Sequence, residues 1–240
     1  MKATIKKIFT AQKARYGHRR IYVELRKQGW PVAKKTVLKL MRGLGLKCKT
    51  RSRKRFSSYR GEVGKIAPNL LERNFQATSP NEKWVTDVTE FKVGEAKLYL
   101  SPIMDLYDRS IIAFSTSRHP TVEFAVSSLQ DAIRQFPGDS SLLVHSGQGF
   151  QYQHARWQHC LATVGAQQSM SRKGNCLDNA VMENFFGHLK EEMFHHDKFD
   201  SIEQLEAEVH EYITWYNTAR VSLTLEGMSP MEYRAHALAA

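Results

Sequence analysis

Hydrophobic and polar positions follow two different periods along this chain, and the first is helical. In the first quarter, apolar residues recur at three- and four-residue spacing from Ile21 to Leu25 and again from Val37 to Leu44. The run between them, QGWPV, contains Gly and Pro and is typical of a tight turn. Two short helices joined by such a turn predict a helix-turn-helix, and a small solvated helical hairpin is the open alternative.

From about residue 80 the pattern becomes that of an α/β domain. Alternating positions rich in β-branched and aromatic residues predict strands over 83–91, 97–107 and 110–117. Helical spacing and short apolar runs then alternate, and they predict helix 121–136, strand 141–146, helix 153–165, strand 166–170, a helix ending near 194 and a helix over 201–217. This order predicts a mixed five-stranded sheet with helices on both faces.

Length and composition narrow the class of protein. The 240 residues correspond to one or two domains, and 42% hydrophobic with 25% charged residues is ordinary for a folded chain. No apolar run approaches the roughly 18 residues of a membrane-spanning helix, and the N-terminus lacks the apolar stretch of a secretory signal. Three scattered cysteines without a C-x-x-C pair predict reduced thiols in a cytoplasmic protein.

The net charge of +11 is unevenly divided. Residues 1–60 contain 20 Lys or Arg against the single acid Glu24, a net of +19, whereas residues 61–240 contain 15 basic and 23 acidic residues, a net of −8. The basic part predicts a polyanionic partner, nucleic acid ahead of an anionic membrane. Within it, the stretch 47–61 holds seven basic residues and is expected to be an extended linker, lying along phosphates or simply solvated.

Two carboxylates are candidates for metal binding. Asp87 lies in the middle of an apolar strand, where a charge is costly unless it is paired or metal-bound; the alternative is a solvent-facing position. Glu183 shares a helix face with Lys190, two turns later, and Gly187 leaves the space between them open. A carboxylate, an open space and an ammonium group along one face would suit a metal ion beside a phosphate backbone. The alternative, which the two residues by themselves favour, is a surface arrangement without a role.

The loop before this helix, SRKGNCLDN, carries Arg172 and Lys173. Its asparagines are expected to cap turns or donate to phosphates, and Asp178 is expected to be the N-cap of the helix. A glycine-rich phosphate loop is absent from the sequence. A structural zinc site is not expected at His154, His159 and Cys160, because no paired motif completes four ligands.

Three long strings carry a family resemblance: NEKWVTDVTEF, LVHSGQGFQYQ and QSMSRKGNCLDNAVMENFFGHLKEE. They resemble bacterial insertion-sequence transposases of the DDE, retroviral-integrase-like superfamily, and most of all the insertion-sequence-three group, which makes its transposase by frameshifting between two reading frames. The similarity runs from YGHRRI (16–21) to YN…R…GMSP (216–230). It implies a basic helix-turn-helix DNA-binding segment at 1–60, a linker at 61–79, a ribonuclease-H-like catalytic core at 80–195 and a C-terminal helical extension at 196–240.

The resemblance implies DNA strand cleavage and strand transfer by three carboxylates that hold two Mg2+ (or Mn2+) ions. Asp87 and Glu183 match the first and third carboxylates. The second motif, His-Ser-Asp-x-Gly, reads His145-Ser146-Gly147-Gln148-Gly149, and 35 residues separate Gly147 from Glu183, as in the family. Glycine has no ligand, and the imidazole of His145 is a poor substitute at Mg2+. We therefore expect a weakened metal site and a catalytically impaired transposase.

The implied partner is double-stranded DNA, as insertion-element ends and as target, in a nucleoid-associated bacterial protein without a membrane partner. The candidate DNA contacts are Arg19, Arg20, Lys34, Lys35, Lys39, Arg172, Lys173 and Lys190. Assembly as a homo-oligomer on DNA is expected, and the upstream-frame product is a further candidate partner. Two origins stay open, a truncated copy and the downstream product alone. The alternative functions are a non-catalytic DNA-binding regulator that inhibits active transposase, and a ribonuclease-H-like nuclease with other substrates.

Overall fold

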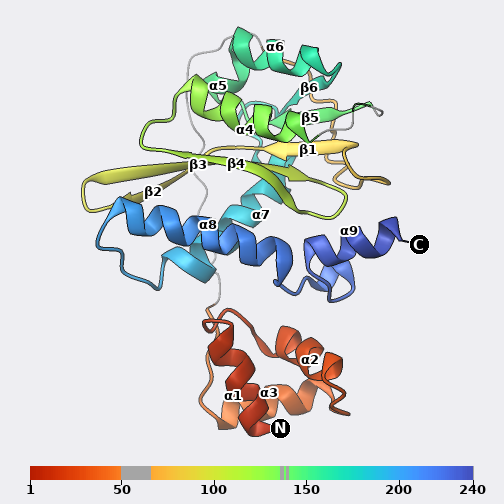
Figure 1. Cartoon of the computed structure of the whole chain (residues 1–240), viewed down its shortest axis with the longest axis vertical. Helices are drawn as coiled ribbons and strands as arrows, with labels where there is room; N and C mark the ends of the chain where they lie inside the picture. Colours follow the sequence, from red (N-terminus) through yellow and green to blue (C-terminus); the bar gives the residue numbers. More distant parts are fainter. Residues whose placement is uncertain (50–65, 136–137, 139–140, 240) are drawn as a thin grey trace.

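The computed structural model describes residues 1–49, 66–135, 138 and 141–239, so most of the basic stretch 47–61 lies outside the described residues. The N-terminal part, residues 1–49, contains helices α1 (Lys2–Ala11), α2 (His18–Lys27) and α3 (Lys34–Gly43). The two predicted helices are confirmed as α2 and α3. Helix α1 was not expected from the pattern, yet its buried Ile5 and Ile8 have helical spacing and pack against the other two helices (Figure 1).

A mixed sheet forms the centre of the second part. Its strands are β1 (Lys83–Thr86), β2 (Thr89–Val93), β3 (Ala96–Asp105), β4 (Ile111–Ser117), β5 (Leu143–Ser146) and β6 (Gln167–Met170). Strands β1, β2 and β4 pair antiparallel with β3, and β5 pairs parallel with both β1 and β6. The predicted mixture of antiparallel and parallel strands is confirmed.

The predicted single strand over 83–91 is wrong, because the chain breaks at Asp87–Val88 into β1 and β2. Both pieces lie along the same edge of β3, so the sheet has six strands among the described residues instead of five. The physical reason is local. The Asp87 carboxylate accepts a hydrogen bond from the N–H of Val88 at 2.9 Å, and this contact replaces ladder pairing at that point.

Helices cover both faces of the sheet, as predicted (Figure 1). Trp84 and Val85 are neighbours in β1 but enter different apolar clusters on the two faces, because side chains alternate along a strand. One face carries α4 (Val122–Arg134), α5 (Phe150–Gln153) and α6 (Ala155–Thr163). The other carries α7 (Ala180–Leu189), its continuation η2 (Lys190–Phe194) and α8 (Ile202–Thr218).

Several shorter elements complete the second part. They are η1 (Cys176–Asn179), η3 (Leu223–Leu225) and the C-terminal α9 (Pro230–Leu238). The segment 66–79 lies along the core: Leu71 is buried, and the N–H groups of Leu70 and Leu71 donate to Oγ of Ser169 in β6. Within the described ranges, no helix is both long and apolar enough to cross a membrane.

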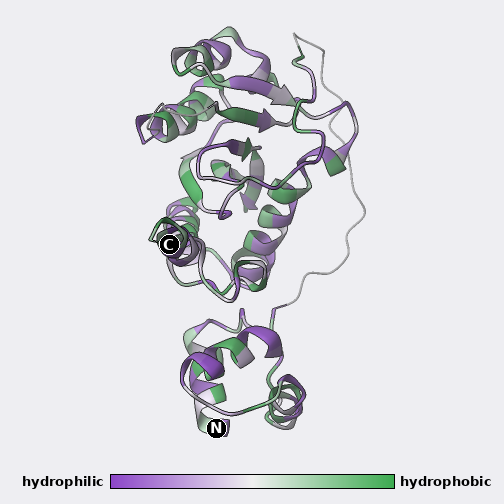
Figure 2. Ribbon diagram, turned by 90° about the vertical axis from the view of Figure 1, so that its right-hand side faces the viewer, coloured by the Kyte–Doolittle hydropathy of each residue, from purple (hydrophilic) through white to green (hydrophobic). Residues whose placement is uncertain are grey.

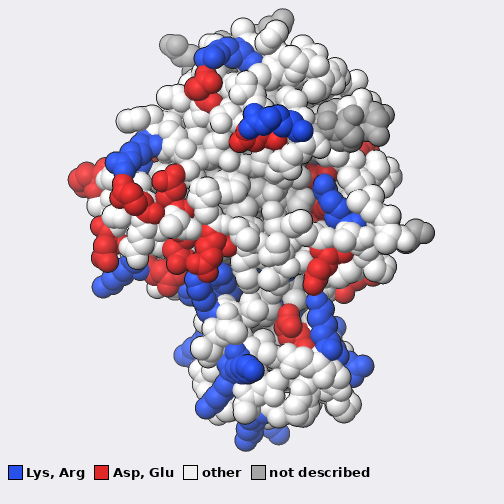
Figure 3. Space-filling model, in the orientation of Figure 1, with Lys and Arg blue, Asp and Glu red and all other residues white. Residues whose placement is uncertain are grey.

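The N-terminal part rests on the end of α8. Val221 and Trp215 join the apolar cluster formed by α1, α2 and α3, and these three helices carry apolar and hydrophilic stretches side by side (Figure 2). The surface charges follow the division seen in the sequence. Lys and Arg side chains gather on the lower, N-terminal part, and Asp and Glu gather on the face over α8 (Figure 3).

Candidate active site

The candidate site begins where two parallel strands end. Thr86 pairs with Ser146, so the next residues, Asp87 and Gly147, lie side by side beyond the ends of β1 and β5. A Cβ atom added to Gly147 would lie 3.1 Å from Oδ1 and 3.5 Å from Oδ2 of Asp87. A side chain at position 147 would therefore point directly at the Asp87 carboxylate, and in this chain that side chain is missing.

Helix α7, which carries Glu183, begins at the same edge. Asn179, at the N-cap position of α7, is buried, and its Nδ2 donates to the backbone O of Thr86 at 3.0 Å. Because residues four apart share a helix face, Glu183 lies on the side of α7 that is fixed against the end of β1. One role expected for Asn179, donation to phosphate, is thus replaced by a bond that orients the helix.

The predicted stripe continues from Glu183 through Gly187 on α7 to Lys190, which lies directly after α7. Lys190 begins η2, and its Nζ lies 5.3 Å from the centre of the Phe91 ring in β2. Lys190 also lies close enough to Glu90 to lower the pKa of that carboxyl group, together with the larger effect of Lys97. The base of the stripe is therefore held beside β2.

Asp87 is half-buried, and its carboxylate is largely removed from water. Burial raises its pKa to about 6, and the hydrogen bond from Val88 opposes that rise. A raised pKa means that the charged form is disfavoured here. Such a group gains from a cation supplied by a ligand, which is common in functional sites.

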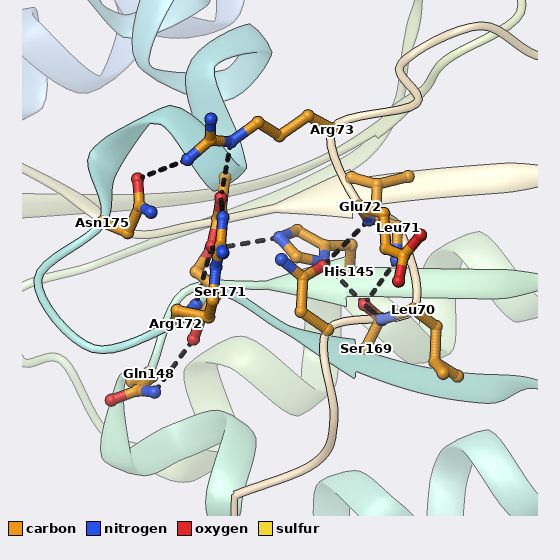
Figure 4. Close-up of polar contacts among 12 residues, drawn as sticks. Leu70, Leu71, Glu72, Arg73, His145, Gln148, Ser169, Ser171, Arg172 and Asn175 are labelled. Carbon is orange, nitrogen blue, oxygen red and sulfur yellow. Dashed lines mark hydrogen bonds and ion pairs between the residues drawn. The ribbon is translucent and has the colours of Figure 1, made fainter.

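The loop between β6 and α7 is held by Asp178, whose carboxylate is fully buried. It accepts hydrogen bonds from Nε, Nη2 and the backbone N of Arg172, and from Nε of Arg73 (Figure 4). The Arg172 guanidinium holds the pKa of Asp178 well below its usual range. The expectation that Asp178 is the N-cap of the helix is wrong: Asn179 occupies that position, and Asp178 anchors the loop instead.

His145 is part of the scaffold beneath this loop. Oγ of Ser169 accepts the N–H groups of Leu70 and Leu71, so its hydroxyl donates to Nδ1 of His145, 2.8 Å away (Figure 4). The neutral ring therefore carries its proton on Nε2 and donates it to Oγ of Ser171 at 3.0 Å. Burial lowers the pKa of His145 to about 4, so the ring stays neutral, and both nitrogens are engaged within the fold.

The basic residues predicted at DNA fall into two groups. Arg19, Lys34, Lys35, Lys39 and Lys173 are exposed. Arg20 forms an ion pair with Glu192, and Arg172 is bound to Asp178. Sequence reasoning missed Arg73 and Glu192, because their partners lie about 100 or more residues away or on another element. Nδ1 of His154 accepts the N–H of Arg156 at the start of α6, an ordinary helix cap.

Comparisons with known proteins agree with this geometry. Residues 77–176 and 183–238 each match an integrase core domain family, and residues 1–55 match the HTH-like domain family. The chain is 48% identical over 234 residues to the putative transposase InsK for insertion sequence element IS150 of Escherichia coli (strain K12), covering 98% of this chain and 82% of that protein. It is 38% identical over 232 residues to the transposase InsF for insertion sequence IS3A of the same strain, covering 96% and 81%.

This chain belongs to the insertion-sequence-three family of bacterial transposases. A transposase-like protein of Haemophilus influenzae (strain ATCC 51907 / DSM 11121 / KW20 / Rd) is 50% identical over 204 residues, covering 85% of this chain and 94% of that protein. The DDE superfamily assignment and the helix-turn-helix prediction are confirmed together with the family.

Solved structures share the fold of this transposase. The HTLV-2 integrase catalytic core domain in complex with magnesium aligns with a TM-score of 0.51 at 16% identity, over 65% of this chain and 98% of that chain. The simian T-cell lymphotropic virus intasome in complex with PP2A regulatory subunit B56 gamma aligns with a TM-score of 0.55 at 18% identity, over 96% of this chain and 74% of that chain. The ribonuclease-H-like, integrase-type core is thereby confirmed.

The residues of this transposase do not fit a site of three carboxylates and two metal ions. Asp87 and Glu183 supply two carboxylates, and Gly147 supplies no ligand at the position that faces Asp87. In the part of the chain that the structure describes, no three His, Cys, Asp or Glu side chains are grouped so as to hold a metal ion. Position 147 therefore offers no side-chain ligand at the place beside the Asp87 carboxylate.

Proposed function

We propose that this chain is a DDE-type transposase that binds insertion-element DNA and is strongly impaired in strand cleavage and strand transfer. The observation that carries the impairment is the geometry of position 147. A Cβ there would meet the Asp87 carboxylate at 3.1 Å, so a carboxylate at 147 would lie beside Asp87, and glycine leaves that place without a ligand. Loss of a residue that only supports a metal ligand costs roughly 10–100-fold, and loss of a bridging ligand costs more.

The proposed partner is double-stranded DNA, both element ends and target. Exposed Arg19, Lys34, Lys35 and Lys39 support phosphate binding by the helix-turn-helix, where lysine and arginine replace condensed counterions. Arg172, Lys173 and Lys190 are further proposed contacts to DNA. Mg2+ or Mn2+ is the proposed cofactor, bound weakly by Asp87 and Glu183, and magnesium is present in one integrase structure of the same fold.

We further propose that the protein assembles with copies of itself on DNA and associates with the nucleoid, with the upstream-frame product as a candidate partner. A second function is favoured by the same observation at Gly147. A chain that keeps the fold and the basic helix-turn-helix but lacks one carboxylate would occupy element ends without cutting them. It would then act as an inhibitor of active transposase.

The deciding experiment compares the native chain with Gly147→Asp on linear DNA that carries the element ends, in Mg2+ and in Mn2+. We expect Gly147→Asp to cleave and join strands at least about 100-fold faster than the native chain. Gly147→Asn is the matched control, because it has the same size without the charge and should stay inactive.

Asp87→Ala in the Gly147→Asp background should abolish the gained activity. Equal rates for the native chain and Gly147→Asp would contradict the proposed impairment. Titration of the native chain into the Gly147→Asp reaction tests the regulatory alternative: a progressive loss of strand joining supports it, and an unchanged rate excludes it.

A further inference from the structure

Two motifs at opposite ends of the chain hold residues that the function proposed above does not use. They are YGHRRI at 16–21 and the YN…R segment that begins at Tyr216. The fold brings both to one side chain, Glu192, which is 3% exposed. Glu192 lies in η2, a π-helical turn closed by the bond from the N–H of His195 to the O of Lys190 at 2.8 Å. This turn continues α7, the helix that carries Glu183.

The Glu192 carboxylate is saturated by donors from three parts of the chain. Arg220 donates from Nε to Oε2 at 2.9 Å and from Nη2 to Oε1 at 2.8 Å. Tyr212 of α8 donates its hydroxyl to Oε2 at 2.9 Å, and Arg20 of α2 donates from Nη1 to Oε1 at 3.0 Å. Burial by itself would raise the pKa of Glu192, but Arg220 and then Arg20 outweigh it and lower that pKa to about 2.

The backbone of the same residue holds a second set of contacts. The O atom of Glu192 accepts Nε of Arg15 at 3.2 Å and Nζ of Lys49 at 3.4 Å. The Arg15 guanidinium is buried and lies 4.6 Å from the centre of the Trp215 ring. Arg15, Arg20 and Lys49 are three of the basic residues of the N-terminal part, and here they bind protein instead of phosphate.

Tyr16 extends the contact next to Arg15. Its hydroxyl donates to the O of Ala219 at 3.0 Å and accepts the N–H of Val221 at 2.8 Å. The ring itself is fully buried. The side of the N-terminal part that bears Arg15, Tyr16 and Arg20 is thus fixed to the second part, whereas Lys34, Lys35 and Lys39 of α3 stay exposed.

We propose that Glu192 is a joint that holds the N-terminal helices in one orientation on the catalytic helix, and that Arg20 acts in this joint and not on DNA. In this arrangement the exposed basic face of α3 has a fixed place relative to Glu183, nine residues before Glu192 on the same helical run. DNA bound by α3 is then presented to the second part in a defined geometry. Glu192 and Arg20 are positioning residues.

The test uses two adjacent arginines as a matched pair in the full chain. Arg20→Ala should lower the midpoint of thermal unfolding by about 4–8 °C, because it removes one partner of a buried ion pair. It should also increase the radius of gyration in X-ray scattering and leave the salt dependence of DNA binding unchanged. Arg19→Ala should instead make the slope of log K against log salt less negative by about 0.9. Its unfolding midpoint and its radius of gyration should equal those of the native chain.

Two further variants separate a joint from general stabilisation. Glu192→Gln should increase the radius of gyration, and Arg20→Ala should add little to it in that background, because both changes break the same contact. Arg20→Lys should restore part of the unfolding midpoint, since its charge still reaches Glu192 without the planar guanidinium fork.

The outcomes that overturn the proposal are distinct. If Arg20→Ala makes the slope of log K against log salt less negative, as Arg19→Ala does, and its unfolding midpoint equals that of the native chain, then Arg20 binds phosphate. If Arg20→Ala and Glu192→Gln unfold earlier but scatter like the native chain, Glu192 stabilises without positioning. The salt measurement rests on the proposed DNA binding; if the native chain binds no DNA, that function fails, and the unfolding and scattering measurements still decide the joint.

Discussion

Glu192 and Asp87 are both carboxylates removed from bulk water, and their surroundings are opposite. Glu192 receives two arginines and a tyrosine hydroxyl from its own chain, and its pKa is lowered to about 2. Asp87 receives a backbone N–H from Val88, faces a glycine across the strand ends, and has a pKa raised to about 6. The charge of Glu192 is balanced by arginines of the fold, whereas the pKa of Asp87 is shifted by burial and by one backbone hydrogen bond.

The difference separates architecture from chemistry. A buried charge that only supports the fold must find its counter-charges in the folded chain, or it is too costly to keep. A charge that serves a bound ion must stay uncompensated until the ion arrives, and the protein loses some stability for it. If Asp87 belongs to the metal site proposed above, Gly147 leaves the fold intact and that ligand set one carboxylate short.

The largest expected effect on stability is at the joint. Glu192→Ala should lower the free energy of unfolding by about 3–5 kcal/mol, because it leaves Arg20 and Arg220 without their buried partner. Urea unfolding followed by tryptophan fluorescence measures it. Glu203→Ala is the control: Glu203 pairs with Arg118 at the surface, where the side chains are 66% and 61% exposed, and its loss should change stability far less than the loss of Glu192. Equal losses for the two variants would refute the contrast.

The second expected effect is a dependence of stability on pH that comes from His145. Its pKa is lowered from 6.5 to about 4 in the fold, so the unfolded chain binds the extra proton first as the pH falls. This group's contribution is complete above pH 6.5, and about 3 kcal/mol of stability is lost between pH 6.5 and pH 4.

The check on His145 is the pH profile of urea unfolding in the native chain and in His145→Gln. Glutamine can accept from Ser169 and donate to Ser171, but it does not titrate. The difference between the two profiles isolates His145 from Asp87, which titrates in the same window with the opposite sign. Parallel profiles between pH 4 and pH 6.5 would show that His145 is protonated in the fold.

A smaller effect of opposite sign is expected at Asp87. Because its pKa is raised, the charged carboxylate destabilises the fold above about pH 6, and this cost disappears below pH 3.8. Asp87→Asn should therefore raise stability at pH 8 by about 1–2 kcal/mol, a range reduced for the partial exposure of this side chain. Stability curves at pH 8 and pH 4 measure it. A loss of stability at pH 8 would place Asp87 with Glu192 among the structural carboxylates.

The smallest expected effect on stability comes from placing a carboxylate at position 147. Without divalent metal, Gly147→Asp should be less stable than Gly147→Asn by about 1 kcal/mol, because two carboxylates would then face each other. Both variants introduce the same crowding against Asp87, so their difference reports charge alone. Added Mg2+ should raise the unfolding midpoint of Gly147→Asp and not that of Gly147→Asn. No response in either variant would argue against a metal site at this edge.

Much of the fold is readable from local pattern. Helices α2 and α3, the mixed sheet and the helices on both faces follow from periodicity, because burial of one face imposes a period of 3.6 or 2 residues. The break at Asp87 was missed, since alternation continues across it and the hydrogen bond to Val88 is invisible in a pattern. Helix α1 was missed although Ile5 and Ile8 carried its signal.

The candidate site was readable in part. Asp87, Gly147 and Glu183 stand out by motif, but their meeting depends on the parallel register of β1 with β5 and on the bond from Asn179 to Thr86. The sequence also marked Asp178 as a helix cap, because a short acid before a helix is usually one. Arginines at positions 73 and 172 gave it a different role, and one of them is 105 residues away.

By itself, the sequence determined the family, the division into a basic segment and an acidic core, and the glycine at position 147. These depend on residue identity and order. Only the tertiary structure decided which charged side chains form ion pairs inside the molecule. The sequence does not distinguish the neighbouring Arg19 and Arg20. In the structure, however, Arg19 is exposed and Arg20 reaches Glu192, 172 residues away. The reason is physical: a counter-charge acts over a few ångströms in space, and folding alone decides which distant residues come within that range.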